Sequence, residues 1–396
     1  MIGGLKAKLT RRGFLKASLI AGGTLLVGFD RMSWLEPSKG EDKDLFQGGK
    51  QLGILDFVGE SRSPLDTVFG AGLDGRLYSD LSSPTPENLV TPIEKFYIRT
   101  RASELLENQK PWLIRLGGLV KQPLNLTLED LKSMVRPTGL HLMECAGNAR
   151  ATRFGMLSVA DWAGAPMSEV LDMVQIKSQA TRVLISGFDR YLTRSTTSIP
   201  GASWVFTFQE VKSCKAFLAT EMNGRPLSKD HGAPVRLVVP GWYGCTCIKW
   251  VNEITLVEDD VEVTSQMQEY ATRTHQPGVP SLAKDYRPAS IDQAAMPIRV
   301  EKWAVNGKIT YRVVGLLWGG SRPVNVLEIR FNPDEDYAPV DSFKQAANDP
   351  WSFWTHAWTL KKTGIYMIRL RVKDPPVPTR RLDTGYYLRS VEITEV

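Results

Sequence analysis

The stretch Gly139-Leu-His-Leu-Met-Glu-Cys145-Ala-Gly-Asn148-Ala-Arg150 decides the fold of this 396-residue chain. Its apolar run predicts a strand from Leu140 to Glu144, and Ala-Gly-Asn predicts a turn directly after Cys145. The sulfur is therefore expected at the end of a strand, next to the turn. A cationic neighbour such as Arg150 would favour the thiolate, which is the form that binds metal or attacks a substrate. Without further context, the alternative for Cys145 is a small buried hydrophobe.

The segments on either side predict an α+β domain over residues 91–276. Thr127-Leu-Glu-Asp130 is a capping-box pattern that predicts a short helix, and residues 168–174 are helical in pattern. Strands and helices do not alternate regularly, which disfavours a doubly wound sheet, and no Gly-x-Gly-x-x-Gly supports a nicotinamide site. Strands are expected at 95–99, 112–116, 140–144, 183–186, 216–220, 234–239, 245–251 and 253–257.

The last hundred residues have a different pattern. Residues 277–297 contain prolines and polar residues and are predicted to be a linker. The spacing of the strands beyond it predicts a β-sandwich over 298–396, with the tryptophans at 351, 354 and 358 in its core or interface. These strands are expected at 298–305, 309–318, 324–331, 353–360, 364–372 and 386–394.

The N-terminal region predicts export. Arg11 and Arg12 stand before an apolar stretch of signal-peptide length, so residues 1–30 are expected to be a twin-arginine signal that directs the chain to the periplasm. The alternative is a chance Arg-Arg before a short membrane-anchoring helix, and removal of the signal stays open. Residues 31–90, rich in Gly, Pro, Ser and Asp, are expected to form an extended arm over the first domain.

Charge and cysteine content exclude several classes of protein. The formal charge is +6, and residues 1–30, with five basic residues and Asp30, account for +4 of it. The remaining +2 is too little for a nucleic-acid binder. Four dispersed cysteines do not make a disulfide scaffold, and no Cys-x-x-Cys or His-x-x-x-His indicates a zinc site.

Glu-Cys145-Ala-Gly-Asn-Ala-Arg resembles the cysteine loop of the sulfite oxidase family of molybdenum-cofactor enzymes. The resemblance implies a molybdopterin-binding domain followed by an immunoglobulin-like dimerisation domain, and hence a homodimer. It runs from about Phe96 to the C-terminus. Further family-like blocks occur in the family's order at residues 96–101, 112–120, 123–131, 162–165, 221–227, 230–241, 248–250, 315–320 and 326–331.

The resemblance also implies a cofactor, molybdenum held by molybdopterin, with Cys145 as the protein's only ligand to the metal. His231, Arg236 and Lys249 match positions that hold the cofactor's phosphate. Their alternative is a surface ion pair or a satisfied core polar residue. His141 and Asp189 are weaker candidates for lining the same site.

Arginines are expected to bind an anionic substrate, because the guanidinium offers paired donors that lysine lacks. Arg99 and Arg150 match the family's substrate-pocket arginines. Arg101 is either an added charge in that pocket or a solvated charge at a strand end. Two positions depart from relatives that oxidise sulfite: Ser195 stands where they have a tyrosine, and Thr246 where they have an arginine. The pocket is therefore expected to handle protons and anions differently.

The favoured hypothesis is an oxidoreductase that transfers an oxygen atom on a small oxyanion, with sulfite oxidation to sulfate first. No Cys-x-x-Cys-His haem attachment sequence is present, so electrons are expected to pass to a separate carrier such as a c-type cytochrome. Two alternatives stay open. One is a molybdopterin-dependent sulfoxide reductase, and the other is a cofactor-free binding protein on the same fold.

Overall fold

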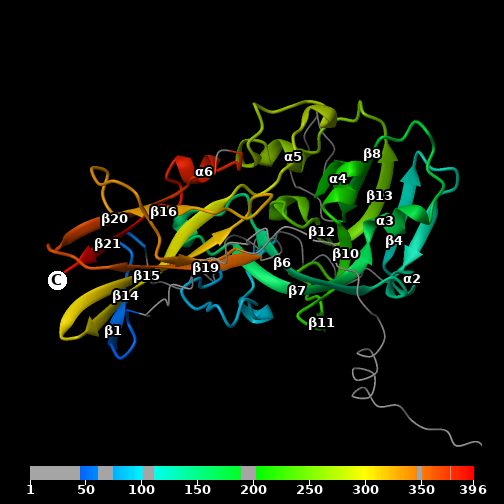
Figure 1. Cartoon of the computed structure of the whole chain (residues 1–396). Helices are drawn as coiled ribbons and strands as arrows, with labels where there is room; N and C mark the ends of the chain where they lie inside the picture. The colour runs from blue at the N-terminus through cyan, green and yellow to red at the C-terminus, as the bar shows by residue number, and fades with distance from the viewer. Residues whose placement is uncertain (1–44, 61–74, 101–110, 189–201, 346–349, 375) are drawn as a thin grey trace, which may run out of the picture. The chain divides into compact units, whose positions relative to one another are not determined.

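The computed structural model describes residues 45–60, 75–100, 111–188, 202–345, 350–374 and 376–396 (Figure 1). These residues lie within one compact unit, Leu45–Val396. The predicted signal segment, and the part of the arm before residue 45, lie outside them. Within the described ranges, no helix combines the length and the apolar character needed to cross a bilayer.

The sheet that leads into Cys145 has the order β11-β10-β7-β6, with β12 also paired to β10. Its longest pairing joins β6 to β7 in antiparallel register, with Glu144 opposite Leu157 at the end next to Cys145. The predicted strand before Cys145 is confirmed, and it begins earlier than expected. The bounds are β6 Arg136–Glu144, β7 Leu157–Pro166, β10 Phe217–Met222, β11 Arg225–Pro226 and β12 Arg236–Val238.

A second sheet of the same region has the order β5-β4-β13-β8-β9. The pairing of β4 with β13 is parallel, whereas the other pairings in this sheet are antiparallel. A mixed sheet without regular crossovers agrees with the predicted α+β class. The bounds are β4 Leu113–Gly118, β5 Leu124–Thr127, β8 Arg182–Gly187, β9 Ser203–Thr207 and β13 Val251–Val257. A separate two-stranded sheet joins β2 Gly75–Leu77 to β3 Ile98–Thr100.

The helices are short, and capping side chains define where they begin. Thr127 accepts a hydrogen bond from the amide of Asp130, whose side chain accepts one from the Thr127 amide, so the predicted capping box is confirmed. Thr207 and Glu210 make the same reciprocal pair. The α-helices are α2 Leu128–Lys132, α3 Met167–Asp172, α4 Phe208–Ser213, α5 Ser265–Tyr270 and α6 Arg380–Asp383. The 3-10 turns are Ile93–Lys95, Arg150–Thr152, Gly244–Thr246, Thr272–Thr274 and Ala283–Asp285.

The C-terminal region forms two sheets, as predicted for a β-sandwich. One has the order β1-β14-β15-β19-β18 and the other β17-β16-β20-β21. Strand β14 of the first contacts β20 and β21 of the second. Figure 1 shows β14 to β21 in yellow to red. The bounds are β14 Ala294–Val305, β15 Lys308–Trp318, β16 Leu327–Arg330, β17 Ala338–Pro339, β18 Ser342–Phe343, β19 Trp351–Trp358, β20 Gly364–Val372 and β21 Arg389–Ile393.

Part of the N-terminal arm belongs to the sandwich. Strand β1, Lys50–Leu55, pairs antiparallel with β14 and extends its sheet (Figure 1, blue). The expectation of an extended arm laid over the first domain does not describe this segment, which pairs with the sandwich sheet. Its pattern gave no strand signal because β1 is an edge strand whose side chains are mostly exposed, so no buried face imposes alternation.

Two further sequence expectations are corrected. Residues 245–251 were expected to be a strand, but Gly244–Thr246 is a 3-10 turn and the strand begins only at Val251. Both Cys245 and Cys247 are buried, and an apolar run that is buried on all sides does not distinguish a strand from a packed turn. Strand β14 also starts at Ala294, inside the expected linker.

A buried carboxylate in β14 predicts how stability depends on pH. Burial acts to raise the pKa of Glu301, but hydrogen bonds from Arg299 (2.8 Å), Arg312 (2.8 Å) and Trp303 (3.0 Å) outweigh it and lower the pKa. A lowered folded-state pKa means that this stabilisation is present above the ordinary glutamate pKa, about 4.3. It is lost as the pH falls through the lower, folded-state pKa.

We therefore expect Glu301→Gln to reduce the free energy of unfolding by about 1–3 kcal/mol at pH 7. The variant should also lose part of the acid-side decline in stability. Urea unfolding from pH 3 to pH 7 measures both effects, with Glu392→Gln on the exposed side of β21 as control. An unchanged acid limb would contradict the role given to Glu301.

Candidate active site

The loop between β6 and β7, residues 145–156, holds the Cys145 sulfur through backbone contacts, and we call it the Cys145 loop. The amide of Gly147 donates to Cys145 Sγ over 3.4 Å, and the amide of Asn148 donates to the Cys145 carbonyl over 2.8 Å. The Asn148 side chain is fully buried, accepts from the Met156 amide (3.1 Å) and donates to Glu144 (3.3 Å). The predicted Ala-Gly-Asn turn is thus present, and Asn148 is the residue that fixes it.

Burial is the main influence on the Cys145 thiol. It raises the thiol's pKa, while Arg99, the amide of Gly147 and Arg273 act to lower it. The cationic neighbours of the sulfur are therefore Arg99 and Arg273. Arg150, which the sequence suggested for this role, is exposed and donates instead to the Leu388 carbonyl. A buried thiol beside two guanidinium groups is suited to binding a metal as the thiolate, because metal binding displaces the proton.

Cys145 lines a cavity of about 130 Å³, which we call the inner cavity. Arg99, Arg236 and Lys249 supply its cationic groups. Gly244 also lines it, and a Cβ there would lie 2.7 Å from the Tyr97 hydroxyl, so a larger residue would have to displace that side chain. The inner cavity therefore brings together Cys145 and three of the cations predicted from sequence.

Arg236 is fully buried and has no carboxylate partner among the described residues. Its guanidinium donates to the carbonyls of His231 (3.0 Å) and Cys247 (3.1 Å) and contacts the sulfur of Met143 (3.2 Å). Its buried Nε has no hydrogen-bond partner. A buried charge without a counter-charge is costly, so the arrangement favours an anion in the cavity.

His231 and Lys249 support this arrangement in different ways. His231 is neutral, because burial, Lys249 and Arg236 lower its pKa to about 4. Its ring nitrogens face Ser228 Oγ (2.8 Å) and the Phe96 carbonyl (3.3 Å), so its ring is already occupied and its carbonyl orients Arg236. The Lys249 ammonium lines the inner cavity and donates to the Arg99 carbonyl over 3.1 Å.

A second, outer cavity of about 550 Å³ borders the same loop. Ala146 and Gly147 lie in its wall, and Arg99 lines both cavities. Arg76, Arg273 and Arg381 add three more guanidinium groups, and the described residues that line it include no Asp or Glu. This composition favours a small anion next to the Cys145 loop.

Several predicted site residues lie elsewhere. His141 is in β6, packs on Phe217 and lines neither cavity, and burial lowers its pKa. Its role beside the cofactor stays a prediction, and neither cavity at the Cys145 loop includes it. Arg150 likewise lines neither cavity. Arg101, Asp189 and Ser195 lie outside the described residues, so their roles stay predictions.

Sequence reasoning missed Arg76, Arg273 and Arg381 as cavity residues and Glu144 as a structural partner of the loop. Lone arginines in otherwise unremarkable segments carry no local signal, because only the fold brings them together. The position of Glu144 directly before Cys145 was a usable signal, since an acidic residue at the end of an otherwise apolar run needs a buried partner.

The residues fit a cofactor that offers a soft metal and an anionic group. A buried thiolate suits such a metal, and the unpartnered Nε of Arg236 suits a phosphate. Gly232 packs closely against Arg236, since it has φ +106° and a Cβ there would meet Arg236 Cβ at 2.9 Å. No group of three or more His, Cys, Asp or Glu in the described part of the chain could hold a metal ion, so Cys145 would bind it without a cluster of such side chains.

Comparison with known proteins identifies this class of site. Residues 102–265 match the family described as the oxidoreductase molybdopterin binding domain. The chain is 27% identical over 326 residues to human mitochondrial sulfite oxidase, covering 76% of this chain and 57% of that protein. It is 25% identical over 305 residues to the NADH nitrate reductase of Ulva prolifera, covering 69% of this chain and 35% of the relative.

A solved structure shows the same fold over nearly the whole chain. The sulfane dehydrogenase SoxCD of Paracoccus pantotrophus aligns with a TM-score of 0.61 at 19% identity, covering 93% of this chain and 96% of that one. Fold and site thus define a molybdopterin-binding oxidoreductase. The chain carries a molybdopterin-binding domain and is similar to sulfite oxidases, so its cofactor is molybdenum held by molybdopterin. The predicted family, fold class and cofactor are confirmed.

Proposed function

We propose that this protein is a molybdenum-dependent enzyme that transfers an oxygen atom on a small oxyanion, with sulfite oxidation to sulfate as the first candidate reaction. In that reaction sulfite gains an oxygen atom derived from water, and two electrons and two protons leave. The electrons would pass to a separate carrier such as a c-type cytochrome, since the sequence has no haem attachment motif. When bound, the cofactor supplies the two-electron chemistry.

The outer cavity is the observation that carries this proposal. Four arginines line it, no carboxylate does so among the described residues, and it borders the loop of Cys145. Arg99 and Arg273 also act on the Cys145 thiol, so an anion held by them would lie near the sulfur. Their role is to attract and orient the substrate, which raises the effective concentration of the reacting groups. On the inner side, Arg236 and Lys249 line the cavity in which the cofactor's anionic end would be held.

Turnover in two directions tests the proposal. We expect purified, cofactor-loaded protein to reduce ferricyanide in the presence of sulfite and to show little turnover with methionine sulfoxide and reduced viologen. The physical reason is that guanidinium groups favour an oxyanion over a neutral sulfoxide. Arg99→Met should raise the KM for sulfite. Arg115→Met is the control and should leave the KM unchanged, because Arg115 forms an exposed ion pair with Glu253. Turnover with the sulfoxide alone would replace this proposal with the reductase.

We also propose export and assembly on the basis of the sequence. Arg11 and Arg12 support the twin-arginine route to the periplasm, with the cofactor inserted before export. The family resemblance of the sandwich supports a homodimer. Cell fractionation after Arg11→Lys with Arg12→Lys tests the first point, and sedimentation equilibrium of the loaded protein tests the second. Wild-type protein retained in the cytoplasm, or a monomer at micromolar concentration, would contradict them.

A further inference from the structure

The residue before Cys145 joins two regions of the molecule. The Glu144 carboxylate is fully buried and accepts hydrogen bonds from Trp318 Nε1 (2.9 Å), Tyr387 Oη (3.1 Å) and Asn148 Nδ2 (3.3 Å). Arg381 Nη1 lies 3.6 Å from it. Trp318, Tyr387 and Arg381 all belong to the C-terminal region, at the end of β15, before β21 and in α6. Most of the partners of this carboxylate therefore come from outside the molybdopterin-binding domain.

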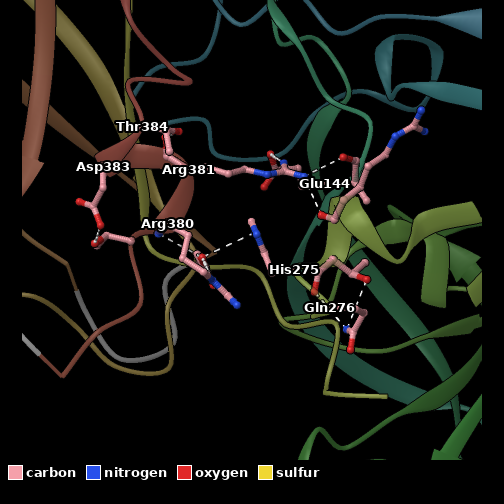
Figure 2. A network of polar contacts seen from close by, with 12 residues as sticks. Glu144, His275, Gln276, Arg380, Arg381, Asp383 and Thr384 are labelled. Carbon is pink, nitrogen blue, oxygen red and sulfur yellow. Dashed lines mark hydrogen bonds and ion pairs between the residues drawn. The ribbon is translucent and has the colours of Figure 1, made fainter. Parts of the chain in front are cut away.

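Arg381 contacts the backbone of the same loop. Its Nη2 donates to the carbonyls of Ala146 (2.7 Å) and Arg273 (2.9 Å), and its guanidinium lies over the rings of Tyr243 (4.7 Å) and Tyr386 (5.1 Å). Figure 2 shows this side chain extending from α6 toward Glu144. Arg381 is itself largely buried, although it also lines the outer cavity.

A third contact lies on the other side of Gly147. The Tyr386 hydroxyl donates to the Asn148 carbonyl. The C-terminal region therefore holds the carbonyls of both neighbours of Gly147, the residue whose amide donates to Cys145 Sγ. Freeing either carbonyl would let the Gly147 peptide turn away from the sulfur.

A separate ion pair fixes α6 itself. Arg380 donates to both carboxylate oxygens of Asp292 (2.8 and 2.7 Å), and His275 Nε2 lies 3.7 Å from the same carboxylate. Asp292 precedes β14, so α6 is bound at its base to the start of the sandwich while Arg381 reaches into the loop.

We propose that Glu144, Arg381 and Tyr386 are positioning residues through which the C-terminal region holds the Cys145 loop in the conformation that binds the cofactor. This inference rests on the assignment of Cys145 as metal ligand, but the contacts that carry it are all made within the polypeptide. The C-terminal region therefore contributes to the site in addition to any role in dimerisation.

Amide hydrogen exchange of cofactor-free protein, followed by mass spectrometry, tests whether these residues hold the Cys145 loop, without any activity measurement. Arg381→Lys keeps the charge but not the paired donors, and we expect it to speed exchange in residues 145–156 by about 5–30-fold. Tyr386→Phe removes one hydroxyl and should give an effect in the same segment at the low end of that range. Peptides from β14 and β15 should exchange as in the wild type, which a general loss of stability would not allow.

A matched control and a double mutant complete the test. Arg322→Lys alters an ion pair with Asp374 (2.6 Å) in the same region, without contact to the loop, and should leave residues 145–156 unchanged. Glu144→Gln combined with Arg381→Met should perturb the loop less than the sum of the two single changes, because the pair acts as a unit.

Exchange in residues 145–156 that is no faster in Arg381→Lys and Tyr386→Phe than in Arg322→Lys overturns the inference. The same holds if exchange rises equally in all peptides. Failure of the sulfite assay would not affect this result, because the measurement uses the cofactor-free chain. The two hypotheses can therefore fail separately.

Discussion

Cys145→Ser is expected to abolish oxidoreductase activity while leaving the fold and most of the molybdenum in place. The reduction should exceed the 10–100-fold that loss of an outer partner of a metal ligand typically causes, because here the ligand itself is changed. Metal should remain because Arg236 and Lys249 still line the cavity and hold the anionic part of the cofactor. Molybdenum per chain, measured on protein from cells that make the cofactor, and turnover with sulfite give the two readings.

Cys214→Ser is the matched control, since Cys214 is half-buried and lines neither cavity. It should keep both metal and activity. Full activity in Cys145→Ser would remove Cys145 from the ligand position. A folded wild-type protein without molybdenum would instead favour the cofactor-free binding protein that the sequence left open.

The parts of the fold that depend on local chemistry could be predicted from the sequence. The capping box at Thr127 and the strand before Cys145 are specified by neighbouring residues, and both are present. Strand β1 could not be predicted, because its partner β14 lies more than two hundred residues further along the chain. The turn at Gly244–Thr246 could not be predicted for a related reason, since burial on all sides removes the alternation of apolar and polar residues that distinguishes a strand.

The residues of the candidate site also divide into those that a sequence motif predicts and those that only tertiary packing brings together. Cys145, Arg236 and Lys249 stand in motifs and lie together in the inner cavity as expected. Arg273 and Arg381 have no motif, and their approach to the Cys145 loop follows from tertiary packing of segments distant in sequence. The choice of Arg150 as the cation beside the thiol failed because nearness in sequence does not fix direction after a turn, and the 3-10 turn that begins at Arg150 leaves its side chain exposed.

Arg236→Met is expected to separate cofactor binding from protein stability. In cofactor-free protein two effects oppose each other: the variant leaves the carbonyls of His231 and Cys247 without a donor, but it also removes a buried charge that has no carboxylate partner. The free energy of unfolding should therefore change by less than about 2 kcal/mol. Affinity for the cofactor should fall by about 10–100-fold or more, since the charge-assisted hydrogen bonds to its anionic group are lost.

Molybdopterin content of the purified protein and urea unfolding of the cofactor-free form measure the two effects. Arg182→Met is the opposite case, because Arg182 has its own carboxylate partner in Asp259 (2.7 Å) and lies in β8. It should lower stability and leave the cofactor content unchanged. If Arg236→Met retained the cofactor as the wild type does, the buried guanidinium would have a structural role only. That result would contradict the proposal that the inner cavity binds an anion. A buried arginine that adds little to the stability of the empty protein but is necessary for cofactor binding is what a site for an anionic cofactor requires.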